Sequence, residues 1–203
     1  MRIGPLFMFL LSTTLIAQSS KTPNGDWPMF NRDLAGTRYS RLAQINASNI
    51  AKLRQVWSYR LQPANFRFAT AGGAAEVAPI VVNGLMYIST QTRIVALAPE
   101  TGNEVWSYDM QGGAASPRGV AYWPGDRQNP PRILFTVGAR LQALNAVTGE
   151  VSTGFGKDGV VDMVVAYNGV PTVFRNLILV GASPGEREDG PPGNSRAYDA
   201  RNG

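Results

Sequence analysis

The sequence of 203 residues contains no cysteine and no histidine. Without cysteine the fold has no disulfide framework, so burial of apolar side chains has to stabilise it. Without histidine the usual general base is missing, and a Ser-His-Asp triad and zinc sites built from His and Cys are excluded. Any metal must therefore be a hard cation bound by oxygen atoms.

Charged side chains are also scarce, at 16% of the sequence, which excludes a coiled coil or a charged disordered tail. The formal net charge is +5, but the basic residues are scattered and form no cluster. A nucleic-acid partner is therefore not expected. A mild positive balance suits a small anionic ligand instead.

The one strongly apolar stretch is residues 1–20, in which Arg2 precedes the apolar run 6–11 and Ala17 marks a cleavage point. This order predicts a cleavable export signal, with the folded domain over residues 21–203. The alternative is a retained membrane anchor, although the run is short for a bilayer span and is interrupted by Ser12, Thr13 and Thr14.

What the sequence has in abundance is turns, with 22 glycines and 14 prolines, and an internal repeat. Segments 93–110, 140–156 and 195–203 share an apolar strand followed by a small polar turn that ends in glycine. The turn glycines recur after 47 residues (102 to 149) and 54 residues (149 to 203), and Trp57 precedes Trp106 by 49. Periods in the forties with several strands each are typical of β-propeller blades.

Each repeat contains a predicted inner hairpin: one at Asn83-Gly84, one through 132–144 and one at Arg175-Asn176. The fold class is therefore all-β, a partial β-propeller of about three four-stranded blades. We expect Trp57 and Trp106 to pack between blades. Helix is scarce, with Asn46 or Ser48 as the predicted N-cap of a turn or two. The repeat ending at Gly203 lacks its returning strand, which predicts the N-terminal part of a longer protein.

Four motifs carry a resemblance to a known family. They are "GDWPMFNRDLAGTRYSRLAQINASNIAKLRQVWSY", "AEVAPIVVNGLMYIST", "ALAPETGNEVWSY" and "RGVAYWPGD". Together they resemble the opening of the pyrroloquinoline quinone (PQQ) dependent dehydrogenases, the quinoprotein glucose and alcohol dehydrogenase family. The resemblance implies a periplasmic enzyme whose full propeller has eight blades, and it extends from Asp26 to Gly203.

The resemblance assigns roles to two residues of this sequence. Glu76 holds the place of the acid that binds the quinone cofactor, and Arg118 that of the arginine beside its reactive carbonyls. A guanidinium there would stabilise negative charge on the quinone oxygen. Read without the family, Glu76 is an exposed loop carboxylate and Arg118 a surface arginine paired with Asp126. Tyr122 and Trp123 are expected to be packing residues.

The segment "LVGASPGE" at 179–186 resembles the family stretch that lines one cofactor edge. The resemblance makes Ser183, Pro184 and Gly185 cofactor-binding residues and Glu186 a Ca²⁺ ligand, which fits a chain restricted to oxygen ligands. The alternative is a solvated Glu186 beside Arg187 in a loop.

Two departures from the family pattern bear on function. Glycines 112 and 113 stand where alcohol-oxidising members carry an adjacent-cysteine disulfide, which favours a sugar or polyol substrate. The threonine expected before the third hairpin is absent, and Asn168 is nearest to its place.

The predicted function is that of the N-terminal part of a PQQ- and Ca²⁺-dependent dehydrogenase for a sugar, polyol or alcohol. Cytochrome c or ubiquinone would accept the electrons, and the protein would associate at most loosely with the membrane. The family's catalytic aspartate and remaining Ca²⁺ ligands lie in later blades, so no catalytic residue is assigned here and these residues alone should be inactive. The alternative is a non-catalytic envelope propeller that serves as a binding or assembly platform.

Overall fold

A computed structural model describes residues 25–61, 76–184, 190 and 193–203, and within them the chain is almost entirely β-structure. The one helix of this part is the 3₁₀ turn η1 (Ile50–Lys52). The strands are β1 (Ile80–Val82), β2 (Leu85–Ser89), β3 (Arg93–Leu97), β4 (Glu104–Asp109), β5 (Ala121–Trp123), β6 (Arg132–Val137), β7 (Arg140–Asn145), β8 (Val160–Asp162), β9 (Thr172–Phe174), β10 (Leu177–Val180) and β11 (Arg196–Asp199). The all-β prediction is confirmed.

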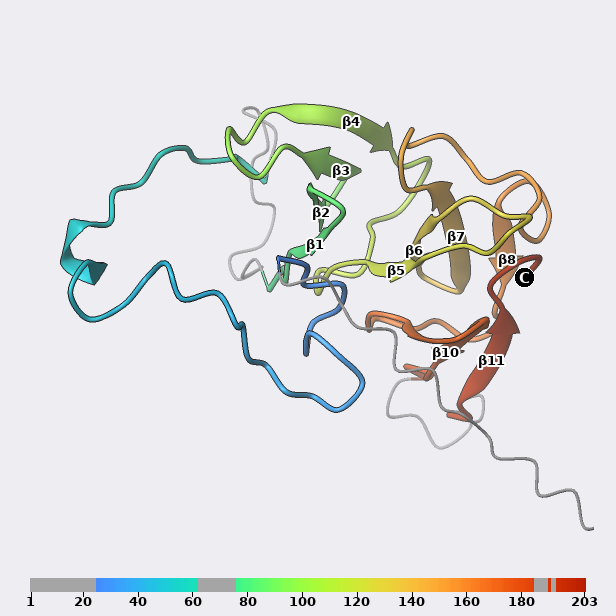
Figure 1. Cartoon of the computed structure of the whole chain (residues 1–203). Coiled ribbons are helices and arrows are strands. Elements are labelled where there is room, and N and C mark those ends of the chain that lie inside the picture. Colours follow the sequence, from blue (N-terminus) through green and yellow to red (C-terminus); the bar gives the residue numbers. More distant parts are fainter. Residues whose placement is uncertain (1–24, 62–75, 185–189, 191–192) are drawn as a thin grey trace, which may run out of the picture.

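The strands form three antiparallel sheets, each made of strands that follow one another in the chain (Figure 1). The orders are β1-β2-β3-β4, β5-β6-β7-β8 and β9-β10-β11. The first two sheets have four strands and the third has three among the described residues. The first strands of the second and third sheets, β5 and β9, contact each other. This is the arrangement of adjacent propeller blades.

Turn chemistry fixes the first and third inner hairpins as the sequence predicted. Asn83 and Gly84 have φ values of 51° and 78°, the positive pair that a type I′ turn needs. Arg175, in the β9–β10 turn, has φ 55°. The hairpin predicted through 132–144 also forms, with its turn at Gly138, but it joins β6 to β7, the second and third strands of their sheet, and is not the inner hairpin. The first two strands of this sheet, β5 and β6, are joined by the longer loop 124–131. This connection could not be predicted from the sequence, because the loop contains prolines and no two-residue turn signal.

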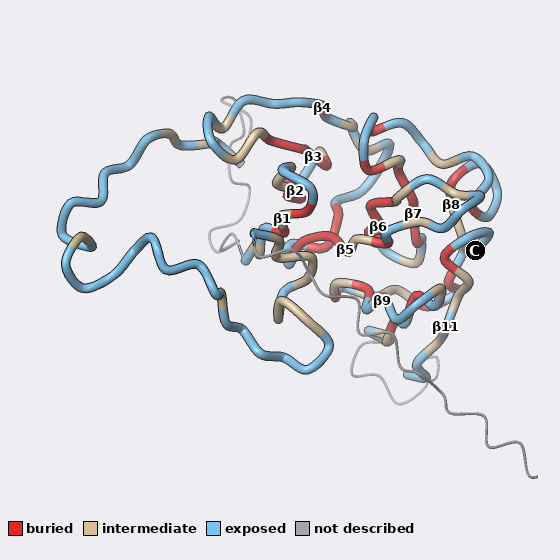
Figure 2. Tube along the Cα trace, viewed as in Figure 1, coloured by how far each residue is buried: buried red, intermediate tan, exposed pale blue. Residues whose placement is uncertain are grey.

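Strand β6 is buried along its whole length because its two faces pack against different sheets. Side chains that alternate along it point to opposite faces. Ile133 and Phe135 join a core cluster with Ile80 and Ile94 of the first sheet. Leu134 joins a second cluster with residues of the third sheet, among them Ile178 and Val180. The buried segments in Figure 2 accordingly concentrate where the sheets face one another.

Tryptophans lock neighbouring repeats together, as the sequence predicted. Trp106 of β4 donates from Nε1 to the carbonyl oxygen of Ala146 at 3.0 Å, and its ring lies over Gly149, where an added Cβ would be 2.6 Å from the ring. Trp57 lies over Gly102 in the same way, with the same 2.6 Å approach. A glycine at each turn is therefore required for the ring of the preceding repeat to dock.

The N-terminal arm, residues 25–61, contacts the first sheet at both of its ends. Near its start, Trp27 exchanges two backbone hydrogen bonds with Val81 of β1. Near its end, the Tyr59 hydroxyl donates to Glu104 of β4 at 2.6 Å and accepts from Arg93 of β3 at 2.9 Å. The arm is therefore held at both edge strands of the first sheet, β1 at its start and β4 at its end.

Between these anchors the middle of the arm extends away from the sheets (Figure 1). The predicted N-caps are wrong here, because Asn49 precedes η1 and provides no side-chain cap. The Asn46 side chain instead accepts from the Ser48 backbone N–H at 3.0 Å, in a turn ahead of the helix. None of the helices in the described ranges has the length and apolar character needed to cross a membrane.

Candidate cofactor site

Glu76 and Arg118 lie 42 residues apart in the chain and form an ion pair between the first two sheets. Glu76 precedes β1 and Arg118 precedes β5, and Arg118 Nε stands 3.5 Å from Glu76 Oε2. The backbones are joined as well, since Ala78 N–H donates to the Arg118 carbonyl oxygen at 3.3 Å. Gly119, with φ 122°, permits this approach because an added Cβ would lie 2.9 Å from the Ala78 carbonyl oxygen.

The alternative partner for Arg118 was wrong. Asp126 is occupied in its own turn, where one carboxylate oxygen accepts from the backbone N–H groups of Gln128 and Asn129, each at 2.9 Å. These hydrogen bonds, with the Asn129 side chain as the largest contribution, lower the pKa of Asp126. Asp126 therefore stabilises its own turn, and the acidic partner of Arg118 is Glu76.

A string of hydrogen bonds extends from Arg118 to the third sheet. The Arg118 backbone N–H donates to Ser116 Oγ at 3.3 Å, and Ser116 Oγ donates to the Asn168 carbonyl oxygen at 2.7 Å. The Asn168 N–H then donates to Ser183 Oγ at 3.3 Å. Three predicted site residues, Glu76, Arg118 and Ser183, which lie in loops beside three different sheets, are thus connected by one path of hydrogen bonds. Neither Ser116 nor this role of the Asn168 backbone was recognised from the sequence.

Of the remaining predicted residues, one lies within the described part of the chain and two lie outside it. Pro184 follows Ser183 directly and is half-buried. Gly185 and Glu186 lie outside the described residues. Within the described ranges no three His, Cys, Asp or Glu side chains gather in a way that could hold a metal ion. The Ca²⁺ assignment to Glu186 therefore stays a prediction.

The Gly112-Gly113 pair has a conformation that side chains would disturb. The φ values are 71° and 95°, and a Cβ at Gly113 would lie 2.7 Å from the Val137 side chain. Arg140 holds the same loop by donating to the Gly112 carbonyl oxygen at 2.8 Å. Glycines in this loop are thus a requirement of its path, because L side chains rarely adopt positive φ.

The aromatic residues next to Arg118 are packing residues, as predicted. Trp123 is fully buried and donates from Nε1 to the Asn176 side-chain oxygen at 3.3 Å. Tyr122 stacks on Tyr87 with 6.4 Å between ring centroids. Burial raises the pKa of Tyr87 to about 12, because its charged form would lie among apolar groups. These rings therefore support the site without forming its surface.

The exposed groups of the path fit an anionic ligand with hydrogen-bonding edges. The Arg118 side chain is 64% exposed and the Glu76 side chain 56%, and their contact is long. An exposed pair of this kind contributes little to stability, so the guanidinium donors are available to another partner. Arginine presents five donors in a rigid fork that matches carboxylate groups. A planar acid such as PQQ would find both a cation and acceptors here.

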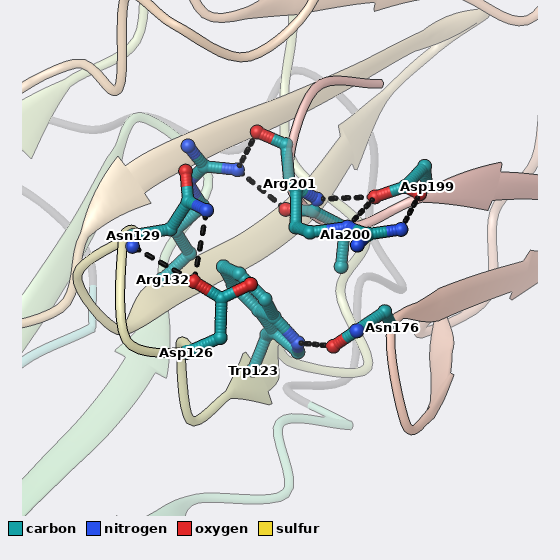
Figure 3. A network of polar contacts seen from close by, with 8 residues as sticks. All are labelled: Trp123, Asp126, Asn129, Arg132, Asn176, Asp199, Ala200 and Arg201. Carbon is teal, nitrogen blue, oxygen red and sulfur yellow. Dashed lines mark hydrogen bonds and ion pairs between the residues drawn. The ribbon is translucent and has the colours of Figure 1, made fainter.

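A second polar network lies between the second and third sheets and contains no predicted site residue (Figure 3). At its centre is Arg132, 3% exposed, whose guanidinium lies 5.3 Å from the Trp123 ring and 5.5 Å from the Phe155 ring. Its Nη1 donates to the carbonyl oxygens of Ala200 and Arg201. This network joins two sheets and leaves Arg132 inaccessible to a large ligand.

Comparison with known proteins defines the class. Residues 27–203 match the family described as the PQQ glucose/ethanol/alcohol dehydrogenase β-propeller domain, and the chain belongs to this family.

Several relatives and one structure show which proteins of this class the chain is similar to. It is 37% identical over 204 residues to the quinohemoprotein alcohol dehydrogenase of Comamonas testosteroni, which covers 92% of this chain and 25% of that protein. It is 29% identical to quinoprotein glucose dehydrogenase A of Acinetobacter calcoaceticus, covering 88% and 27% of the two chains. The structure of quinohemoprotein alcohol dehydrogenase ADHIIG from Pseudomonas putida HK5 superposes with a TM-score of 0.70 at 30% identity, covering 89% of this chain and 26% of that one. The chain thus spans about a quarter of the length of these relatives.

Proposed function

We propose that this chain is the N-terminal part of a PQQ- and Ca²⁺-dependent dehydrogenase that oxidises a sugar, polyol or alcohol. The observation that carries the proposal is the hydrogen-bonded path from Glu76 through Arg118 to Ser183. It links Glu76, Arg118 and Ser183, which lie beside the strands of three sheets, through the Arg118 side chain on one side and its backbone N–H on the other, with the two charged side chains open to solvent. Family membership alone supports the fold, whereas the residues of this path support the proposal that the protein binds the cofactor.

Each residue of the path has a proposed role. PQQ, when bound, supplies a quinone that accepts two electrons from the substrate. Arg118 would bind the cofactor's oxygens and stabilise negative charge on them, because its charge cannot be titrated near neutral pH. Glu76 would accept hydrogen bonds from the ring N–H. Ser183, Pro184 and Gly185 would line the cofactor's carboxylate edge, and Glu186 would bind Ca²⁺.

The proposal also includes a substrate class and an electron acceptor. Glycines 112 and 113 replace the disulfide of alcohol-oxidising members, and this favours a sugar or polyol. The electrons would pass to a cytochrome c or to ubiquinone. Both kinds of acceptor occur in the names of relatives, in 1-butanol dehydrogenase (cytochrome c) and alcohol dehydrogenase (quinone).

The proposed place of action is the periplasm, with residues 1–20 removed on export and at most loose association with the membrane. The N-terminal sequence of the protein purified from a periplasmic fraction tests this. Recovery of an intact residue 1 in the membrane fraction would favour the retained anchor.

The activity is tested with the full-length protein that contains this chain, prepared without cofactor and then loaded with PQQ and Ca²⁺. Dye reduction is measured with glucose, glycerol and short alcohols, and PQQ binding is measured by titration. We expect Arg118→Ala and Glu76→Ala each to weaken PQQ binding by about tenfold to a hundredfold, the range for lost charge-assisted hydrogen bonds.

The matched control is Arg127→Ala, which removes another exposed arginine of the same repeat and should leave PQQ binding unchanged. A wild-type protein that neither binds PQQ nor reduces dye would contradict the proposal. That result would favour a non-catalytic propeller of the cell envelope.

A further inference from the structure

Ser116 lies two residues before the exposed Arg118 and is itself 4% exposed. All of its polar groups are bonded. Its N–H donates to the Thr136 carbonyl oxygen at 3.1 Å, and its carbonyl oxygen accepts from Ser89 Oγ at 3.0 Å. Its hydroxyl accepts from Arg118 N–H and donates to the Asn168 carbonyl oxygen. Ser116 therefore touches all three sheets or the loops that precede them.

Two more buried hydroxyls extend this arrangement into a polar seam, defined here as Ser89, Ser116 and Thr136. Ser89 and Thr136 are each 1% exposed. Thr136 Oγ1 donates to the Gly169 carbonyl oxygen at 3.3 Å, beside the Asn168 carbonyl oxygen that Ser116 binds. The seam thus crosses from β2 through the 116–119 turn and β6 to the loop 166–169.

Buried hydroxyls need a reason in strands whose other buried side chains are mostly apolar. Each one costs free energy unless it is hydrogen-bonded, and an apolar side chain of similar size would fill the same space. The acceptors along the seam are backbone carbonyl oxygens of loops that come from other parts of the chain. The hydroxyls therefore fix where these loops lie relative to one another.

We propose that Ser116 is a positioning residue for the cofactor site: its hydroxyl ties the backbone of Arg118 to the loop 166–169. Because Asn168 N–H donates to Ser183 Oγ, the Ser116 hydroxyl is a direct link between the arginine turn and the serine of the site. This inference rests on the proposed PQQ function. Ser116 acts through Arg118 and is not itself a catalytic residue.

The test uses the full-length protein with the variants Ser116→Ala, Arg118→Ala and the double variant. We expect Ser116→Ala to weaken PQQ binding about tenfold at fixed Ca²⁺. The change removes a hydrogen bond and leaves the Asn168 carbonyl oxygen without the donor that Ser116 provides. In the Arg118→Ala background the same change should weaken PQQ binding clearly less, because only the position of Ser183 remains to be lost. Residues that act through one another are not additive, whereas a serine with only a general structural role would weaken both backgrounds equally.

Ser152→Ala is the matched control, because Ser152 Oγ is buried and has no hydrogen-bond partner. It should leave PQQ binding unchanged and should not lower the melting temperature, because it removes a buried hydroxyl that has no hydrogen bond to lose. If Ser116→Ala does not fold, Ser116→Cys replaces it, since a thiol keeps the size with a weaker donor. Equal losses in both backgrounds, or unchanged PQQ binding in Ser116→Ala, would overturn the inference.

Hydrogen exchange of the cofactor-free protein separates this inference from the proposed function. The Arg118 amide donates to Ser116 Oγ, so Ser116→Ala should speed its exchange about tenfold while Ser152→Ala does not. A wild-type protein that fails to bind PQQ would refute the proposed function. The exchange result would then decide whether Ser116 holds the Arg118 turn, and unchanged exchange would overturn that role.

Discussion

Arg118 and Arg132 are 14 residues apart in the chain and sit in opposite environments. Arg132 is 3% exposed, lies between two aromatic rings and donates to two carbonyl oxygens of the third sheet. Arg118 has a side chain that is 64% exposed and one contact at 3.5 Å. Burial lowers the pKa of Arg132 below its ordinary value. The buried Arg132 guanidinium donates from Nη1, while its Nε has no hydrogen-bond partner among the described residues, whereas the Arg118 side chain is mostly exposed to solvent.

The difference separates a stability region from a ligand region. The polar groups of Arg132, Trp106 and Trp123 form hydrogen bonds to segments of neighbouring repeats. The inner path keeps its backbone bonded through Ser116 while its charged side chains point to solvent. A site that receives a ligand needs groups whose hydrogen-bonding capacity is not already used.

The largest expected effect is on stability and comes from Arg132→Ala. The change leaves the Ala200 and Arg201 carbonyl oxygens without a donor and a cavity between Trp123 and Phe155. We expect a loss of about 3–5 kcal/mol of unfolding free energy, measured by urea denaturation of the full-length protein. Arg132→Met, which refills the cavity without charge, should recover part of it.

Arg118→Ala is the matched comparison and should change stability by less than about 0.5 kcal/mol. Equal destabilisation by the two alanine variants would break the distinction between the two regions.

The second effect concerns the tryptophan contacts, with Gly149→Ala compared to Gly84→Ala. Both glycines have nearly the same positive φ, 77° and 78°, but only Gly149 lies under a tryptophan ring. The backbone strain of about 1–2 kcal/mol should be common to both variants. Gly149→Ala should lose a further ~1–3 kcal/mol from overpacking against Trp106. Thermal unfolding measures the difference, and equal melting temperatures would show that the ring can move aside without cost.

A smaller effect is expected at the anchor of the arm. Tyr59→Phe removes the hydroxyl that joins Glu104 to Arg93, at a cost of about 1 kcal/mol. The arm should then become more sensitive to limited proteolysis while the sheets unfold at nearly the same temperature. Tyr39→Phe, at an exposed arm residue, should leave the cleavage rate unchanged. Faster cleavage in both variants would mean that the hydroxyl of Tyr59 does not hold the arm.

The smallest effect is on acid stability. Hydrogen bonds from Arg201 lower the pKa of Asp199 to about 2 from its ordinary value of 3.8. A lowered pKa stabilises the fold above the ordinary value, and this contribution disappears as pH falls from about 4 to about 2. The pair is partly exposed, so the contribution should stay below about 1 kcal/mol. Asp199→Asn should flatten the pH dependence of the urea midpoint in this window, and an unchanged slope would exclude the pair as its source.

Local turn chemistry made much of the fold predictable. The Asn83-Gly84 hairpin and the turn at Arg175 depend on a few adjacent residues with positive φ, which a sequence displays directly. The hairpin of the second repeat was placed one strand too far inward, because the loop 124–131 contains no short turn signal. Trp106 over Gly149 followed from the repeat itself, since the same spacing recurs.

The site was only partly predictable. Family resemblance brought Glu76, Arg118 and Ser183 to attention and gave Arg118 the cofactor as its partner. The alternative reading without the family paired Arg118 with Asp126, and neither reading predicted the ion pair with Glu76. Ser116 could have been noticed as a serine two residues before an arginine, the spacing at which a hydroxyl accepts the later backbone N–H. Nothing in the sequence announces that its hydroxyl reaches Asn168, which is 52 residues away.

The sequence by itself determined the turns, the blade-like period and the restriction to oxygen and cationic groups, because each depends on residue type or on short spacing. The tertiary structure alone decided that Arg118 faces solvent beside Glu76 while Arg132 is enclosed between rings. Both are arginines near the start of a strand in the same repeat. Their roles differ because burial and hydrogen-bond partners come from segments that only the packing of the sheets brings into contact.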